Sequence, residues 1–402
     1  MSINGALGPV VAVVAVDVGE TKAAVLVTDS ARHRLLGPLE FSMTAGGLAQ
    51  VITKSQALLP AGVTRVGVEA AGHYHRPLAA PSVWPGWEVV ELNPAHVSEQ
   101  RRMMGRRRIK TDALDLEAIT ELLLAGRGLL VTEPPTSIVQ LTAWAAHRHR
   151  RVASRTATKN QLLGQLDRCF PGLTLALPDV LGTKVGRLVT AEFADPDRLV
   201  RLGPARFVRF AAARGLQVRR PIADRVVAAA RDALPSPDAV AARQVLAADL
   251  ALLAVLDEQV QAAETRMGEL VTAGPFAPLL SVPGWGVVRV GNYGAAVGDP
   301  ARWPGHRQLY RASGLSPAQY ESAGRRRDGS ISREGSVQLR RALIDLGIGL
   351  WHADQAARRY GQQLRARGKK GGVIGCAMAH RANKIAYALV RDQSGHDADR
   401  WA

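Results

Sequence analysis

The N-terminal part of the chain has an order of apolar segments that few folds can accommodate. Its first two segments are rich in β-branched residues and are separated by the polar turn Gly19-Glu20-Thr21, which predicts a β-hairpin. A third strand would complete an antiparallel meander, and alternating helix and strand patterns follow. The expected elements are strands at 9–18, 22–29 and 33–42, a helix at 46–59, and strands at 64–69 and 87–92. This order predicts an α/β domain.

Acidic residues stand where these segments end. Asp17 closes the first apolar run, and Glu69 closes the run RVGVEA. A helix is expected to begin at Thr111 or Asp112, so Asp112 and Asp115 should share one helix face. Mg²⁺ prefers carboxylate and water oxygens, and paired ions could stabilise the attacking and leaving oxygens of a phosphoryl transfer. We interpret the four acids as a metal site, although each alone could close a turn or complement a helix dipole.

The strand order is that of the ribonuclease H-like fold, to which RuvC-type nucleases belong. A second interpretation is open, because VAVDVGETKAAV also resembles the first phosphate-binding hairpin of sugar kinases and actin-like ATPases. Those enzymes need a second Gly-rich phosphate loop and an adenosine-binding Gly pair, which we do not find. A net charge of +17 is also unusual for a metabolic kinase.

The charge of the chain points to a polyanionic partner. The 402 residues, 47% of them hydrophobic, are enough for two or three domains with their own cores. A sequence pI near 10.7 favours nucleic acid, because neutralised phosphates release counterions. A basic protein associated with the ribosome or a membrane is the alternative.

Cysteine usage and hydropathy favour the cytoplasm. Cys169 and Cys376 lie far apart and form no zinc motif, which fits a reducing compartment. Asp17, Glu20 and Lys22 interrupt the N-terminal apolar stretch, so we expect no membrane span there or elsewhere and no signal peptide.

The dipeptide Pro134-Pro135 marks a boundary. Long helix patterns at 137–169 and 238–273 bracket a region, 170–237, that is rich in Pro, Ala and Arg and for which we expect short helices and turns. They predict an antiparallel helical arm used for dimerisation or for RNA, unless they form a plain pair of core helices. The expected domains are a metal-binding domain at 1–134, the arm at 135–273 and a mainly α-helical domain at 274–402.

Basic segments lie beside both candidate chemical groups. Residues 279–294 contain the turn PGWG and resemble a helix-hairpin-helix, which presents backbone N–H groups to a phosphate. Ser322 precedes an arginine run in a basic loop and could be a nucleophile, although most loop serines only form turns. A basic helical tail follows at 355–391. The residues expected to contact nucleic acid are Arg101, Arg102, Arg106, Arg107, Arg108, Lys110, Arg325, Arg326 and Arg327.

The combination of motifs resembles the insertion-sequence one-ten family of bacterial transposases. Asp17, Glu69 and the stretch NPAHVSEQRRMMGRRRIKTDALDLEAI resemble the DEDD domain of that family. The segments LLSVPGWG, GLSP, YESAG and DGSISREGSVQLRRAL resemble its second domain, in the same order. The resemblance covers nearly the whole chain.

The resemblance implies an RNA-guided DNA recombinase. It assigns Asp17, Glu69, Asp112 and Asp115 to Mg²⁺ binding, and Ser322 to a covalent phosphoserine link with DNA. It also implies a bridge RNA and homodimers that pair into a tetramer, with the serine and the carboxylates of one site coming from different subunits. The alternative is a metal-dependent junction endonuclease, or a site-specific invertase, that needs no guide RNA.

Two features depart from the family pattern. The usual Ser-Gly-Gly is Ser-Ala-Gly at Ser322-Ala323-Gly324, and an alanine restricts positive φ, although it leaves the hydroxyl in place. The region 170–237 is long for the family and carries no motif that we can assign.

Overall fold

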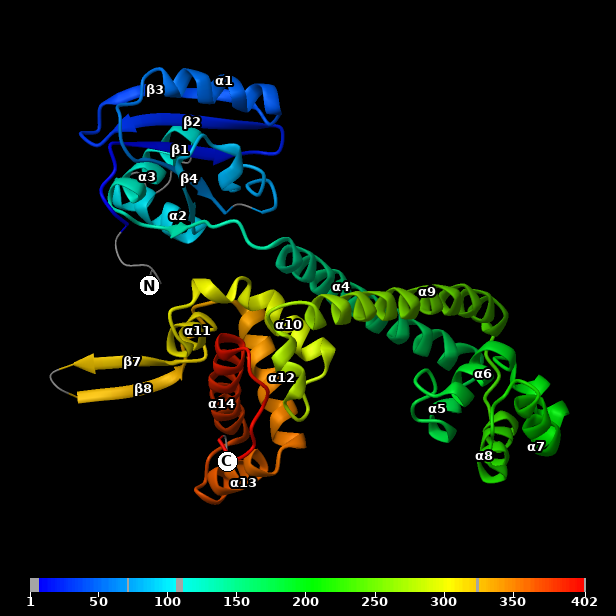
Figure 1. The fold of residues 1–402 in the computed structure, drawn as a ribbon. Coiled ribbons are helices and arrows are strands. Elements are labelled where there is room, and N and C mark those ends of the chain that lie inside the picture. The colour runs from blue at the N-terminus through cyan, green and yellow to red at the C-terminus, as the bar shows by residue number, and fades with distance from the viewer. Residues whose placement is uncertain (1–6, 71, 106–110, 323–324, 401–402) are drawn as a thin grey trace. The chain divides into compact units, whose positions relative to one another are not determined.

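The computed structural model describes residues 7–70, 72–105, 111–322 and 325–400, with the backbone alone for 321, 322 and 325–328. The chain forms two compact units, Met1–Pro135 and Thr136–Ala402. Figure 1 shows a sheet with helices in the first unit and a mostly helical second unit. The mixed α/β character of the first unit and the helical character of the second agree with the sequence prediction.

A six-stranded mixed sheet forms the first unit, in the order β3-β2-β1-β4-β5-β6. The strands are β1 (Ala12–Val18), β2 (Lys22–Asp29), β3 (Arg34–Ser42), β4 (Thr64–Glu69), β5 (Glu88–Leu92) and β6 (Leu129–Leu130). The meander β1-β2-β3 is antiparallel, β4 lies parallel to both β1 and β5, and β6 pairs antiparallel with β5. The five strands predicted from the sequence are confirmed within three residues at each end, and β6 was not predicted.

Helices cover both faces of this sheet, which explains why its central strands are almost continuously apolar. One face packs against α1 (Ala45–Gln56) through residues that include Val14 and Val16. The other face packs against α2 (Pro94–Met103) and α3 (Asp112–Leu124) through residues that include Val13 and Ala15. Neighbouring residues of a strand face opposite sides of the sheet. The side on which each remaining residue of β1 lies therefore follows from this division.

Two long helices of the second unit run antiparallel. They are α4 (Thr136–Cys169) and α9 (Ala239–Thr272), and both were predicted from their apolar spacing. Ion pairs join them along their length, Arg148 with Glu264 and Arg155 with Asp257. The earlier residue of α4 pairs with the later residue of α9, as an antiparallel arrangement requires.

The region between the long helices has a core of its own. It contains α5 (Leu173–Ala176), α6 (Lys184–Glu192), α7 (Pro196–Ala212) and α8 (Arg220–Arg231). Phe170, Phe193 and Phe207 are buried there together with Leu246 and Leu253 of α9. The short helices predicted for 170–237 are therefore present, and they pack on the far ends of the two long helices rather than forming an unstructured insertion.

A second helical core contains the rest of the unit. Its elements are the 3-10 helix η2 (Ala277–Ser281), α10 (Val287–Val297), the 3-10 helix η3 (Pro300–Arg302), α11 (His306–Ala312), α12 (Val337–Ala353), α13 (Gln355–Ala366) and α14 (Gly371–Asp392). Trp285 is buried in this core and its Nε1–H donates to the carbonyl of Leu346. The predicted helix-hairpin-helix differs in its first member, because η2, which ends one residue before the PGWG turn, is a 3-10 helix instead of an α-helix.

The basic segment after GLSP forms a β-hairpin, whereas the sequence analysis expected a loop. Its strands are β7 (Pro317–Ser322) and β8 (Arg325–Ile331), paired antiparallel. In Figure 1 this hairpin projects from the helices of its unit. A run of arginines hid the strand pattern, since the alternation of polar and apolar residues that marks a half-buried strand is absent there.

Among the described residues, α9 is long and apolar enough to cross a membrane by length and composition. No apolar run in this helix was expected to be long enough for a span, because the apolarity of the helix comes from many alanines between the leucines. Only 22% of its most apolar window is buried, so much of this apolar surface is exposed. A long helix of a soluble protein can have the same length and apolar composition, so these two properties alone are weak evidence for a membrane span.

Candidate active site

Asp17 and Glu69 lie side by side in the sheet. The parallel register pairs Val16 of β1 with Val68 of β4, and Asp17 and Glu69 are the next residue of each strand. By alternation, Asp17 shares the face of Ala15, which packs against α3. Both acids are half-buried. The register therefore brings together, at the carboxyl ends of β1 and β4, two acids that are far apart in the sequence.

Helix α3 runs antiparallel to β1 and β4. Its last turns lie near the start of β1, because the carbonyl of Gly126, just after α3, accepts from the N–H of Leu7. Near the same end, Glu121 pairs with Arg32, in the turn that follows β2, with 2.9 Å between Oε1 and Nε. The first turn of α3 is therefore directed toward the strand ends that carry the two acids.

The first turn of α3 supplies the other two acids. Thr111 is the N-cap, and its side chain accepts from the N–H of Leu114, so the helix begins where the sequence predicted. Asp112 is exposed, whereas Asp115 is 3% exposed. The Asp115 carboxylate accepts a hydrogen bond from a guanidinium nitrogen of Arg101 on α2.

The four acids fit Mg²⁺ in the chemistry of their donor atoms, but their side chains do not converge on one point. Carboxylates at two adjacent strand ends and one helix start are the oxygen donors that this ion takes. Within the described part of the chain, however, no three His, Cys, Asp or Glu side chains converge as ligands. Arg101 accounts for one of the acids, since it binds the Asp115 carboxylate that a metal would need.

The basic run before α3 is only partly described. Arg101 pairs with Asp115, and Arg102 is exposed with its Nη2 3.3 Å from the Ser98 hydroxyl. The remaining members of the predicted contact set in this run lie outside the described residues: Arg106, Arg107, Arg108 and Lys110. Both described arginines thus have an intramolecular partner, and for Arg101 that partner is one of the predicted metal ligands.

Ser322 is the last residue of β7 and belongs to the second unit. Its backbone pairs with that of Arg325, the first residue of β8, so the two flank the tip of the hairpin. The register continues with Glu321 opposite Arg326 and Tyr320 opposite Arg327. The predicted nucleophile and the three predicted arginine contacts are therefore grouped at one end of a hairpin.

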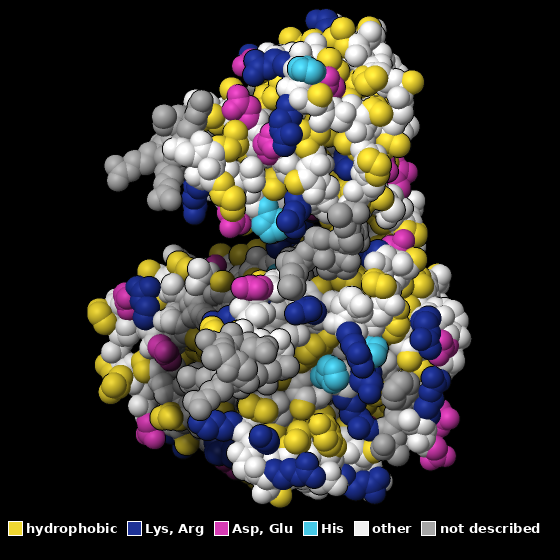
Figure 2. Space-filling view, turned by 90° about the vertical axis from the view of Figure 1, so that its left-hand side faces the viewer, with side chains coloured by type: hydrophobic (Ala, Val, Ile, Leu, Met, Phe, Trp, Pro, Cys, Tyr) yellow, Lys and Arg dark blue, Asp and Glu magenta, His cyan; other side chains and the backbone are white. Residues whose placement is uncertain are grey.

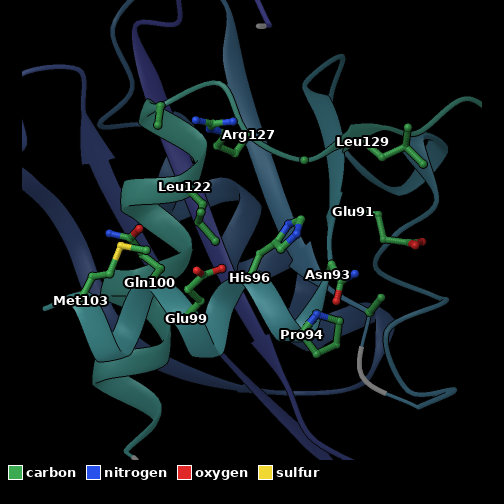
Figure 3. Close-up of a pocket in the computed structure, with 13 residues that line it drawn as sticks. Glu91, Asn93, Pro94, His96, Glu99, Gln100, Met103, Leu122, Arg127 and Leu129 are labelled. Atoms are coloured by element: carbon green, nitrogen blue, oxygen red, sulfur yellow. The ribbon is translucent and has the colours of Figure 1, made fainter. Parts of the chain in front are cut away.

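A hollow of about 770 Å³ lies in the first unit, beside the carboxylate edge. Figure 3 shows Asn93 and Pro94, which begin α2, together with His96 and Glu99 from the same helix. Ala70, the residue after Glu69, also lines the hollow, but none of the four predicted metal ligands does. Its lining combines apolar side chains such as Leu122 and Met103 with the charged Glu91, Glu99 and Arg127, and sequence reasoning had noted only the Asn-Pro pair.

A cluster of basic groups joins α11 to α14 in the second unit. His306 and His380 lie near Lys384, and burial together with these neighbouring cations lowers the pKa of both histidines. The Tyr310 hydroxyl donates to the Cys376 carbonyl at 3.1 Å and fixes the two helices together. Figure 2 shows Lys and Arg side chains on this unit with histidines beside some of them. Sequence reasoning missed this cluster, because its members are far apart in the chain.

Comparison with known proteins identifies two transposase segments in the order seen here. Residues 14–171 match a DEDD transposase domain of IS110 elements, described as a transposase. Residues 277–362 match the transposase IS116/IS110/IS902 family. The first segment contains the four acids, and the second contains Ser322.

Relatives agree with this assignment. The chain is 25% identical over 295 residues to a 43.6 kDa protein of insertion element IS110 from Streptomyces coelicolor, and the match covers 72% of each chain. It is 27% identical over 290 residues, 71% of each chain, to a 44.8 kDa protein of insertion element IS116 from Streptomyces clavuligerus. It is also 27% identical to the transposase for insertion sequence element IS1328 from Yersinia enterocolitica, over 28% of this chain and 34% of that one. On these matches, the chain belongs to the IS110 family of insertion-sequence transposases.

Proposed function

We propose that this transposase is a Mg²⁺-dependent, RNA-guided DNA recombinase that cuts and rejoins DNA through a covalent phosphoserine. The observation that carries the proposal is the meeting of Asp17 and Glu69 in register at the carboxyl ends of β1 and β4, facing the start of α3. Acids from three separate elements at one sheet edge are difficult to explain as independent turn or cap residues.

The topology supports a ribonuclease H-like, RuvC-type assignment for the first unit. An antiparallel meander of three strands is followed by two parallel strands on the other side of β1. Helices cover both faces, and the acids lie at strand ends and a helix start. This agrees with the strand order and acid positions on which the sequence prediction was based.

In the proposed reaction, Ser322 supplies the nucleophile. Its hydroxyl oxygen forms a bond to phosphorus, the bond from phosphorus to the 3′ oxygen breaks, and the serine proton passes to solvent or to the departing oxygen. Arg325, Arg326 and Arg327 offset negative charge on the phosphate. Mg²⁺ held by Asp17, Glu69, Asp112 and Asp115 would supply further stabilisation of charge at the phosphate.

The proposed partners are DNA, a guide RNA and further copies of the chain. The net charge of +17 favours both nucleic acids. On α9, Val245, Leu252 and Val255 are between 45 and 47% exposed and follow one another at the spacing of a coiled-coil seam. This exposed stripe supports a homodimer formed through the long helices, which we expect to pair further into a tetramer.

The test uses two variants on DNA that carries the element ends, with Mg²⁺ and candidate element-end RNA. Ser322→Ala should abolish strand exchange and any DNA–protein adduct, and Asp17→Asn should abolish cutting while nucleic-acid binding persists. Cutting that survives in Ser322→Ala would favour the alternative, a junction endonuclease in which water replaces the serine. Full activity of Asp17→Asn would remove the carboxylates from the reaction.

A further inference from the structure

The Arg101–Asp115 pair lies at the point where the proposed metal site needs an open carboxylate. Asp115 is almost fully buried at the start of α3, and the Arg101 side chain, from α2, is 17% exposed. The two helices pack on the same face of the sheet, so the pair joins two elements of one core. It is therefore held by packing on both sides, unlike a pair of flexible surface groups.

Such a pair stabilises the fold whenever no metal is bound to Asp115. A carboxylate that is buried without a partner loses its hydration and destabilises the fold strongly, whereas a hydrogen-bonded guanidinium restores the balance of charge. A divalent cation does the same when its ligands surround it. Arg101 and a metal are therefore two alternative cations for one anion, and their like charges oppose simultaneous binding.

We propose that Arg101 is an internal counter-cation which occupies Asp115 in the metal-free protein and has to withdraw before a divalent metal binds that carboxylate. The inference rests on the proposed function, because it takes Asp115 as a metal ligand. It accounts for the Asp115 carboxylate, which in this structure is bonded to Arg101. Metal affinity is then set partly by the strength of an ion pair inside the protein.

The test compares Mn²⁺ binding to the full-length protein and to two charge-matched variants, by titration calorimetry and by the electron paramagnetic resonance of free Mn²⁺. Arg101→Gln removes the partner of Asp115. Arg102→Gln removes the same charge one residue along the helix, from a side chain bonded to Ser98. We expect Arg101→Gln to bind Mn²⁺ at least tenfold more tightly than wild type, and Arg102→Gln to change the affinity less than threefold.

Equal affinities of wild type and Arg101→Gln would overturn the inference, and so would equal gains in the two variants, since the gain would then reflect net charge alone. If Arg101→Gln does not fold, Arg101→Lys replaces it, because a lysine keeps the charge but loses the two-pronged hydrogen bonding of a guanidinium. That variant should bind Mn²⁺ more tightly than wild type, and affinity equal to that of wild type would contradict the inference.

Failure of the proposed function would look different. Asp17→Asn would then leave Mn²⁺ binding unchanged in both the wild-type and the Arg101→Gln backgrounds, which would exclude these acids as ligands. Loss of binding in Asp17→Asn, together with no effect of Arg101→Gln, would keep the metal site and reject the role of Arg101 alone.

Discussion

Gly67 sets how closely α3 approaches the sheet. Its replacement by alanine should destabilise the packing of α3 on β4, beside the carboxylate edge. A Cβ at this position of β4 would lie 2.6, 2.7 and 2.9 Å from Cδ1, Cδ2 and Cγ of Leu123 on α3. Ordinary carbon contacts are about 3.5–4.0 Å, so atoms have to move by about 1 Å. Leu123 is fully buried, which leaves its side chain little room to turn away.

The size of the effect follows from two opposing contributions. Overpacking of a well-filled core costs about 1–3 kcal/mol. Replacing a glycine in a strand recovers about 0.5–1 kcal/mol of backbone entropy. Gly67→Ala should therefore lower the unfolding free energy of the first unit by about 1 kcal/mol, within limits of about 0 and 2.5 kcal/mol. The displaced α3 should weaken Mn²⁺ binding at its first turn.

A double-mutant cycle isolates the contact. Leu123→Ala alone should cost about 2–5 kcal/mol because it leaves a cavity, but it also makes room for the new methyl group. In that background Gly67→Ala should be neutral or stabilising. Hydrogen exchange of peptides from β4 and α3 reports the free energies, with Gly164→Ala as a control because a Cβ there meets nothing within 4 Å. Costs that add to within about 0.5 kcal/mol would refute the reasoning.

Two further predictions concern the second unit. Burial, Lys384 and His306 lower the pKa of His380 below its ordinary 6.5, so the unfolded chain binds this proton more tightly. Stability should therefore fall as the pH drops below about 6.5. His380→Asn should reduce that fall in urea unfolding between pH 7 and 5, and an unchanged slope would contradict the assignment. Leu252→Glu should convert a dimer to a monomer in light scattering, because it places a charge in the exposed apolar stripe of α9. The same charge at the exposed position Gln244, in Gln244→Glu, should leave the dimer intact. A dimer that persists in Leu252→Glu would contradict that interface.

Much of the first unit could be predicted because its information is local. The apolar runs that end at Asp17 and Glu69 have the length of strands, and Thr111 is an N-cap residue followed by an apolar helix pattern. Local patterns also defined the two long helices. The spatial order of the strands rests on pairings between distant segments. The acids were singled out by their positions at the ends of apolar runs and at a helix start, and the resemblance to known transposases supported that interpretation.

The features that were missed depend on contacts that no local pattern records. Arg101 had the same appearance as its neighbours in a basic run, and only the packing of α2 beside α3 turns it toward Asp115. The β7–β8 hairpin has few apolar residues, so its strands gave no alternating signal. The short helices after Phe170 were predicted, but the core that they form with the ends of α4 and α9 was not, because it joins residues far apart in the chain.

The most direct test of the account is the identity of the residue that becomes attached to DNA. The protein is incubated with Mg²⁺, element-end RNA and DNA, denatured, digested with protease and nuclease, and analysed by mass spectrometry. The account predicts a phosphate-linked nucleotide on the peptide that contains Ser322, and its absence when Asp17 is replaced by asparagine. A nucleotide on another residue, or efficient strand exchange without any adduct, would contradict the central claim.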